Sequence, residues 1–123
     1  MNTKEIGNAG EERAYELLAS KGYAIIGRNV IIGHVEVDIL AMYGARVVVI
    51  EVKTRRDDHL DSNFAIDREK IYRLCRAGAN YVKSNNLPHE VQIDAILITN
   101  HADGTADVEH MEDIAMPPRR RRR

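Results

Sequence analysis

The sequence lacks most of the features that mark specialised protein classes. Its single cysteine excludes an intramolecular disulfide and a thiolate metal cluster, so Cys75 is expected to be a small core residue. No run of about eighteen apolar residues occurs, and the first residues lack the apolar segment of a signal peptide. These absences predict a cytoplasmic protein that does not span a membrane.

An overall excess of basic charge is also absent. The formal net charge is −1, and subtracting the five arginines Arg119 to Arg123 leaves the rest of the chain at −6. An acidic body argues against indiscriminate coating of DNA, which depends on neutralising phosphates, but one local basic patch beside a bound metal would still serve a nuclease.

The chain is long enough for one hydrophobic core, and its end differs from the rest in composition. Pro117 and Pro118 stop the preceding structure, so we expect one domain over residues 1–116 and a flexible Pro/Arg-rich tail over residues 117–123. Two interpretations of the tail stay open: it contacts nucleic acid, or it is peculiar to this chain.

Hydrophobic periodicity and turn residues predict the order helix, three strands, helix, strand, strand. A helix between two strands of one sheet makes a right-handed crossover, which places the fourth strand parallel to the third. The fold class is therefore α/β, with a mixed central sheet flanked by helices. The expected elements are helices Thr3 to Lys21 and Ile66 to Ser84, and strands Tyr23 to Ile32, Val35 to Met42, Arg46 to Thr54, Val91 to Thr99 and Ala106 to His110.

The segment between Asp38 and Glu51 is predicted to be a tight hairpin. Gly44 followed by a small residue suits a two-residue loop whose first position needs a positive φ. Counting back along both strands places Asp38 opposite Glu51 and Glu36 opposite Lys53. Directly opposed residues have Cβ atoms about 4.5–5.5 Å apart, so all four polar side chains are expected on one face.

Two carboxylates this close repel each other, and a divalent cation with oxygen ligands removes that repulsion. Beside them, the Lys53 ammonium would hold an attacking water or offset charge on a phosphate. The alternative is a solvated sheet face, where Glu-x-Lys sequences are common. The apolar run Val47 to Ile50 favours the functional interpretation, because charges at the end of a doubly buried strand more often line a cleft.

The first helix contains a candidate third carboxylate. Gly7 and Gly10 each cost the helix about 1 kcal/mol relative to alanine, so we expect them to allow close approach to the sheet. Glu11 then points inward, while Glu12 and Glu16 point to water. The alternative is that Glu11 is a partly exposed residue at the helix edge.

Several motifs together resemble the YraN family of small uncharacterised bacterial proteins, and the likeness extends to about residue 115. They are Gly10-Glu11 with Ala14, Gly22-Tyr23, Arg28-Asn29, Glu36 to Leu40, and Val49 to Arg55. That family is classed with the restriction-endonuclease-like superfamily, which includes archaeal Holliday junction resolvases. The resemblance implies an αβββαβ core, a nuclease centre that uses Mg²⁺ (or Mn²⁺), and a cytoplasmic location.

The resemblance also implies roles for particular residues. Glu11, Asp38 and Glu51 correspond to the metal-binding acids, and Lys53 completes the catalytic set. Where the family usually has glycine, this chain has Val35, which leaves the carboxylates intact. Five further residues are predicted to hold the phosphate backbone or line its approach: Arg55, Arg56, Lys70, Arg28 and Asn29.

Structural interpretations compete with some of these roles. Lys70, which matches a family lysine, would otherwise be a surface residue at the start of a helix, and Asp57 and Asp58 would neutralise Arg55 and Arg56. No His-x-x-x-His spacing occurs, so the histidines are interpreted as loop and surface residues: His34, His59, His89, His101 and His110.

We therefore predict a Mg²⁺-dependent DNA endonuclease that acts on structured or branched DNA. One alternative is a non-catalytic module that keeps the fold and grips DNA without cutting it. The other is an adaptor of a DNA-processing complex, whose acidic body meets a basic protein. Resolvase-like enzymes act as dimers, and exposed apolar positions such as Phe64 and Tyr72 would allow a homodimer.

Overall fold

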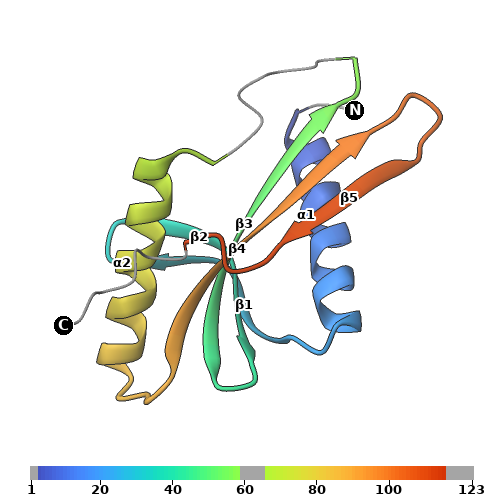
Figure 1. Cartoon of the computed structure of the whole chain (residues 1–123). Helices are drawn as coiled ribbons and strands as arrows, with labels where there is room; N and C mark the ends of the chain where they lie inside the picture. Colours follow the sequence, from blue (N-terminus) through green and yellow to red (C-terminus); the bar gives the residue numbers. More distant parts are fainter. Residues whose placement is uncertain (1–2, 59–65, 116–123) are drawn as a thin grey trace.

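The helices and strands follow one another in the order predicted from the sequence (Figure 1). The computed structural model describes residues 3–58 and 66–115, with side chains from residue 9 onward. Phe64, His59 and the predicted tail over residues 117–123 lie outside the described residues. The elements are α1 (Thr3–Ser20), β1 (Ala24–Ile32), β2 (Val35–Tyr43), β3 (Arg46–Arg56), α2 (Arg68–Ser84), β4 (Glu90–Asn100) and β5 (Ala106–Met111).

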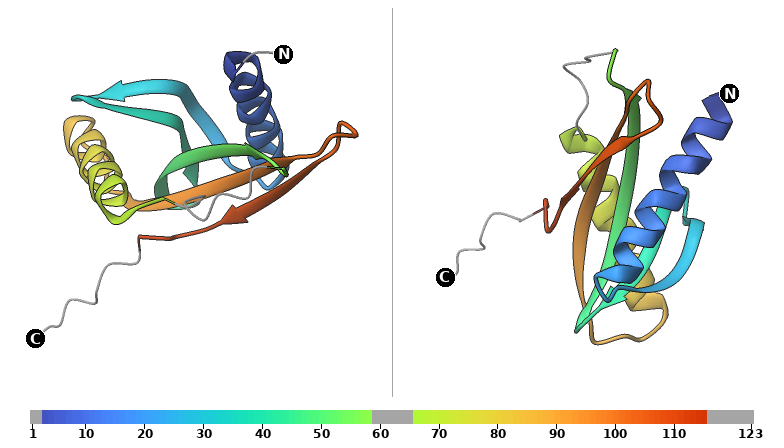
Figure 2. Two further views of the ribbon diagram at one scale, coloured as in Figure 1. Left: turned by 90° about the horizontal axis from the view of Figure 1, so that it is seen from above. Right: turned by 90° about the vertical axis from the view of Figure 1, so that its right-hand side faces the viewer.

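The strands form one mixed sheet in the order β1-β2-β3-β4-β5. All neighbours are antiparallel except β3 and β4, which are parallel because α2 connects them as a crossover. The two helices cover opposite faces of the sheet (Figure 2). The predicted α/β class with a mixed sheet between helices is confirmed. In the described residues, neither helix is long and apolar enough to cross a membrane.

Strand β3 lies at the centre of the sheet and is buried on both faces. Val48 and Ile50 contact the core under α1, whereas Val47 and Val49 contact the core under α2. This is why the run of four apolar residues shows no alternation. Glu51 follows directly, so the site begins where the doubly buried segment ends.

Two glycines let the helices approach the sheet closely. A Cβ atom at Gly10 would clash with the hydroxyl of Thr54, as the close approach predicted for α1 requires. A Cβ atom at Gly78 in α2 would lie 2.5 Å from Cγ1 of Val91 on β4. These contacts fix how deeply each helix sits on its face.

The predicted register of the β2–β3 hairpin holds from its turn at Gly44, where φ is +59°, to the pair formed by Ile39 and Ile50. Beyond that pair the two strands separate, because β2 continues beside β1 while β3 continues beside β4. Two-stranded ribbons twist strongly, so the outer part of the β1–β2 hairpin turns away from β3. The predicted pairs further out are therefore wrong: Asp38 is not opposite Glu51 in the ladder, and Glu36 is not opposite Lys53.

The third strand is longer than predicted. Arg55 and Arg56, expected in a loop, pair with Thr99 and Asn100 at the end of β3. Parallel pairing with β4 therefore extends the sheet two residues past the predicted end at Thr54.

Candidate metal centre

We call the point beyond Ile39 and Ile50, where β2 and β3 separate, the fork. There a backbone amide of β3 has no ladder partner on β2, and the Asp38 side chain takes that place. The Val52 amide donates a hydrogen bond of 2.8 Å to Oδ2 of Asp38. A buried N–H group must be paired, so this bond both satisfies β3 and fixes the carboxylate at the fork. Asp38 therefore reaches Glu51 by capping the strand rather than by ladder pairing.

Asp38 and Glu51 lie close enough to perturb each other's ionisation. Glu51 is buried, and burial together with the neighbouring Asp38 carboxylate raises the pKa of Glu51 to about 7. Burial also raises the pKa of Asp38, against the hydrogen bond from Val52, the charge of Lys70 and a hydrogen bond from the Glu51 carboxyl group. The fold thus brings together two acids, and the negative charge of Asp38 disfavours ionisation of Glu51.

Two lysines lie beside this acid pair. Lys70 lies in the first turn of α2, and its Nζ is 3.6 Å from Oε2 of Glu51 on β3. Asp67 caps that helix by accepting a 2.8 Å hydrogen bond from the Lys70 amide. This bond fixes the backbone position from which the Lys70 side chain extends. Lys53 is half-buried, two residues after Glu51 on the same strand, and its charge lowers the pKa of Glu51. Lys70 is therefore part of the site rather than a remote surface lysine.

Glu11 lies at the edge of the site. It accepts a hydrogen bond of 3.2 Å from Nδ2 of Asn29. Burial raises its pKa against this bond, and the charges of Asp38 and Glu36 raise it further. Within residues 3–58 and 66–115, no group of three or more His, Cys, Asp or Glu side chains is arranged to hold a metal ion. The described centre thus consists of two adjacent acids, with Glu11 further out.

Asn29 adopts a left-handed conformation with φ of +54°, in the strand that borders the fork. Its neighbour Arg28 turns toward α1, where Nη2 lies 3.0 Å from Oε1 of Glu12 and the guanidinium stacks over the ring of Tyr15. The two residues predicted to line the DNA approach therefore bind α1 in this structure.

The two arginines at the end of β3 also have protein partners. Nε of Arg55 donates to Oγ1 of Thr99 at 3.2 Å, and Arg56 forms an ion pair of 3.3 Å with Asp58. The second contact is the neutralising interaction considered as an alternative. It is exposed, and exposed pairs are worth about 0–1 kcal/mol, so it holds Arg56 only weakly.

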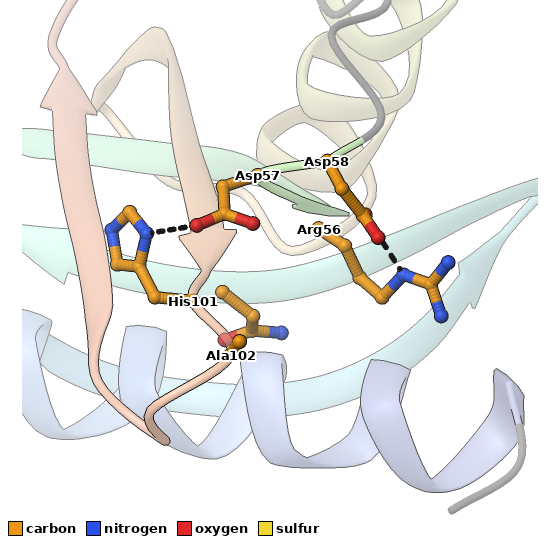
Figure 3. A pocket seen from close by; sticks show the side chains of 6 residues that line it. Arg56, Asp57, Asp58, His101 and Ala102 are labelled. Carbon is orange, nitrogen blue, oxygen red and sulfur yellow. Dashed lines mark hydrogen bonds and ion pairs between the residues drawn. The ribbon is translucent and has the colours of Figure 1, made fainter.

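Asp57 has a different partner from the one expected. Figure 3 shows it pointing at His101, whose Nδ1 lies 2.6 Å from Oδ2 of Asp57. The other ring nitrogen of His101 is 2.9 Å from Asp107, and the hydrogen bond to Asp57 is the largest of the effects that raise the pKa of His101. These contacts border a pocket of about 250 Å³ at the ends of β3 and β4. They join β3 to β5 and lie apart from the acid pair along β3.

A buried polar network in β4 was not predicted. Asp94 is fully buried and accepts four hydrogen bonds of 2.8–2.9 Å, from Tyr23, His110, Gln92 and the Asp113 amide. These bonds hold the pKa of Asp94 below its usual value, although burial opposes them. Two polar residues within the apolar run of β4 were the signal that would have revealed it.

The interpretation of His110 as a surface residue is wrong. Its side chain is 4% exposed, and its Nε2 is 2.8 Å from Asp94. Nζ of Lys21, which can only donate a hydrogen bond, lies 2.8 Å from Nδ1 of the same ring. The ring therefore links the segment between α1 and β1 to β4 and β5.

Comparison with known proteins identifies one family. The model of a family described as "Uncharacterised protein family UPF0102" matches residues 10–98, a range that includes the acid pair and both lysines. A UPF0102 protein of Bacteroides thetaiotaomicron is 35% identical over 115 residues, covering 93% of this chain and 94% of the relative. Another, from Leifsonia xyli, is 37% identical over 112 residues, covering 89% and 95%. A third, from Dictyoglomus turgidum, is 36% identical over 102 residues, covering 80% and 85%.

Proposed function

Since the chain belongs to the UPF0102 family, whose description states no activity, we propose a function from the chemistry of its own site. The function is hydrolysis of DNA phosphodiester bonds with the help of Mg²⁺ or Mn²⁺. The observation that carries it is the pair formed by half-buried Asp38 and buried Glu51 at the end of the doubly buried run of β3, with Lys53 and Lys70 beside it.

The donor set fits a hard divalent cation. Carboxylate oxygens are the ligands that Mg²⁺ and Mn²⁺ prefer, and Mg²⁺ keeps several waters while binding one or two carboxylates. Burial raises the pKa of both acids, and the charge of Asp38 raises that of Glu51 further, so a bound cation would favour their ionised forms. In this proposal Asp38 and Glu51 would hold the ion, and Glu11 would assist directly or through water.

Each residue around the pair has a defined task. The bound ion supplies Lewis acidity, which polarises a phosphate and lowers the pKa of a water. The Lys53 ammonium orients the attacking water and offsets the charge that develops on the phosphate as the 3′ oxygen leaves. Lys70 holds Glu51 in place and contributes a second positive charge where the DNA backbone arrives.

The order of elements also supports this function. A helix, an antiparallel three-stranded unit, a crossover helix and a parallel strand match the αβββαβ order of the restriction-endonuclease-like superfamily. We propose membership of that superfamily, with resolvase-like action on branched DNA, in the cytoplasm. Arg55 and Arg56 extend β3 beyond Lys53 and would contact the backbone at the end of the strand, with Arg55 on the same face as Lys53.

Cleavage assays test the proposal. Linear, flapped and four-way DNA are incubated with the protein and Mg²⁺ or Mn²⁺, and with the variants Asp38→Asn and Lys53→Ala. We expect metal-dependent nicking that both variants lower by about 10²–10³-fold, because each loses a group that stabilises the transition state. Lys83→Ala, an exposed lysine at the far end of α2, is the matched control and should retain activity.

The rival function is a non-catalytic module that binds DNA. The separation of Glu11 from the acid pair favours it, because no third acidic ligand completes a metal site in the described residues. DNA binding without cleavage of any substrate, unaffected by Asp38→Asn, would support the rival and contradict the nuclease.

A further inference from the structure

Among the helices and strands of the described part of this chain, α2 carries the highest net positive charge. α2 holds five Arg or Lys residues and one Glu, a net charge of +4. The whole chain carries −1, so everything outside α2 carries −5. A helix of this charge on an otherwise acidic protein marks where a polyanion would bind.

The outward side of α2 borders a groove of about 300 Å³ that the metal centre does not use. Its opposite wall is the turn between β1 and β2, which lies beside α2 in Figures 1 and 2. We call it the α2 groove. Its lining includes His34 and Val35 from the turn, and Tyr72, Arg73, Arg76 and Asn80 from the helix.

The groove combines an exposed aromatic ring with available cations. Tyr72 is 61% exposed, and the guanidinium of Arg76 lies 5.9 Å from the centre of its ring. Within the described residues, neither Arg73 nor Arg76 forms an ion pair, whereas Arg28 and Arg56 do. A ring flanked by guanidinium groups without acidic partners suits a ligand that carries both flat bases and phosphates.

The groove and the metal centre both use residues of α2. Residues three apart on a helix are neighbours, so Lys70, Arg73 and Arg76 form one row that winds part of the way around α2. Lys70 begins that row at 3.6 Å from Glu51. A helix rises about 1.5 Å per residue, so Arg76 lies about 9 Å along the axis from Lys70.

We propose that the α2 groove binds a single-stranded segment of the DNA substrate. One unpaired base stacks on Tyr72, and the adjoining phosphates contact Arg73 and Arg76. The role as a substrate subsite rests on the proposed nuclease function, but binding of single strands by the groove does not. An acidic peptide would satisfy the arginines and leave the ring unused, and paired bases would keep their faces inside the duplex.

The absence of tryptophan gives a direct test of stacking. Tyr72→Trp places one fluorophore in the groove, and Tyr43→Trp places one at the β2–β3 turn as the matched control. Each variant is titrated with a 20-nucleotide oligothymidylate and with a 20-base-pair duplex, without divalent metal so that no cleavage occurs. We expect the single strand to quench the indole fluorescence of Tyr72→Trp but not that of Tyr43→Trp, and the duplex to quench it much less.

Affinities measured by fluorescence anisotropy test the individual contacts. Tyr72→Ala should bind the oligothymidylate roughly 5- to 150-fold more weakly, the range for loss of one stacked base, while Tyr72→Phe binds normally. Arg73→Ala with Arg76→Ala should lower the slope of log K against log salt by about 1.4, because two single-strand phosphate contacts are lost. Arg13→Ala with Lys83→Ala removes the same charge from exposed positions outside the groove lining and should change affinity less.

Three results would overturn this subsite. The first is equal affinity of wild type and Tyr72→Ala for the oligothymidylate. The second is equal displacement of the oligothymidylate by polyglutamate of matched charge, which would mark a surface for acidic proteins. The third is a concentration-dependent dimer that Tyr72→Ala abolishes, with no DNA binding. None depends on cleavage, so the subsite can fail while the nuclease stands, and loss of cleavage in Asp38→Asn can be judged separately.

Discussion

At the scale of single residues, the centre depends on how Asp38 is held. The sequence predicts that Asp38 and Glu51 become neighbours, and the acids do influence each other's pKa. The predicted reason, ladder pairing, is replaced by a hydrogen bond to the Val52 amide. That bond exists only because β2 and β3 diverge, and the divergence depends on the twist of the whole sheet. A pairing rule along two strands could not reveal it.

The raised pKa of Glu51 predicts how stability changes with pH. Its pKa rises from 4.5 in the unfolded chain to about 7 in the folded protein, so the folded state binds more protons between these values. The free energy of unfolding should therefore fall as pH rises from 4.5 to 7, by on the order of 3 kcal/mol from this group. Asp38 and Glu11 act in the same direction.

Asp38→Asn tests this account, because asparagine still accepts from Val52 but removes the charge that raises the pKa of Glu51. We expect the variant to be more stable than wild type above pH 7 and equal to it near pH 4.5, in urea denaturation across that range. Glu109→Gln, at an exposed glutamate on β5, is the control. A variant that is less stable at every pH would show that the acids do not repel.

At the scale of elements, the sequence predicts the order of helices and strands and the parallel pairing of β3 with β4. These follow from local periodicity, from turn residues such as Gly44, and from the handedness of crossovers. The end of β3 was misplaced because polar residues after Thr54 look like a loop. Only pairing with β4 keeps Arg55 and Arg56 in the sheet.

Gly78→Ala tests the close approach of α2 to the sheet. In an exposed helix this change would stabilise by about 1 kcal/mol. Here the new methyl group would meet Val91 at 2.5 Å and Val49 at 3.3 Å, so the free energy of unfolding should fall by about 1–3 kcal/mol. Chemical denaturation measures the change, and Ala79→Gly at the exposed neighbouring position should cost about 1 kcal/mol. A stabilised Gly78→Ala protein would contradict the packing described for α2.

The network around Asp94 holds β5 and the segment after it against β4. Asp94→Ala leaves several buried donors unpaired, so stability should fall by about 3–5 kcal/mol at pH 7. Amide exchange of residues 106–114 should accelerate most. If Asp94→Ala does not fold, the milder Asp94→Asn should show the same pattern of exchange, and Glu109→Ala on the exposed side of β5 should not. Unchanged exchange in β5 would show that the network does not hold it.

At the scale of the whole molecule, charge is divided between an acidic body and a basic α2. The acidic total can be counted from the sequence, but the position of the basic helix beside the acid pair depends on the crossover that brings Lys70 to Glu51. This explains why Lys70 could be interpreted as a surface residue from its sequence alone. The buried His110 was misjudged for a similar reason, since its partners Asp94 and Lys21 are distant in the chain.

Calorimetric titration of the protein with Mn²⁺ and Mg²⁺ tests the central claim that Asp38 and Glu51 bind a divalent cation. The account predicts one site whose affinity increases between pH 6 and pH 8, with release of protons near pH 7, because Glu51 must ionise to bind the metal. Asp38→Asn should abolish it, and Asp107→Asn should not. No metal binding by the wild type at pH 8, or equal binding by Asp38→Asn, would contradict the account.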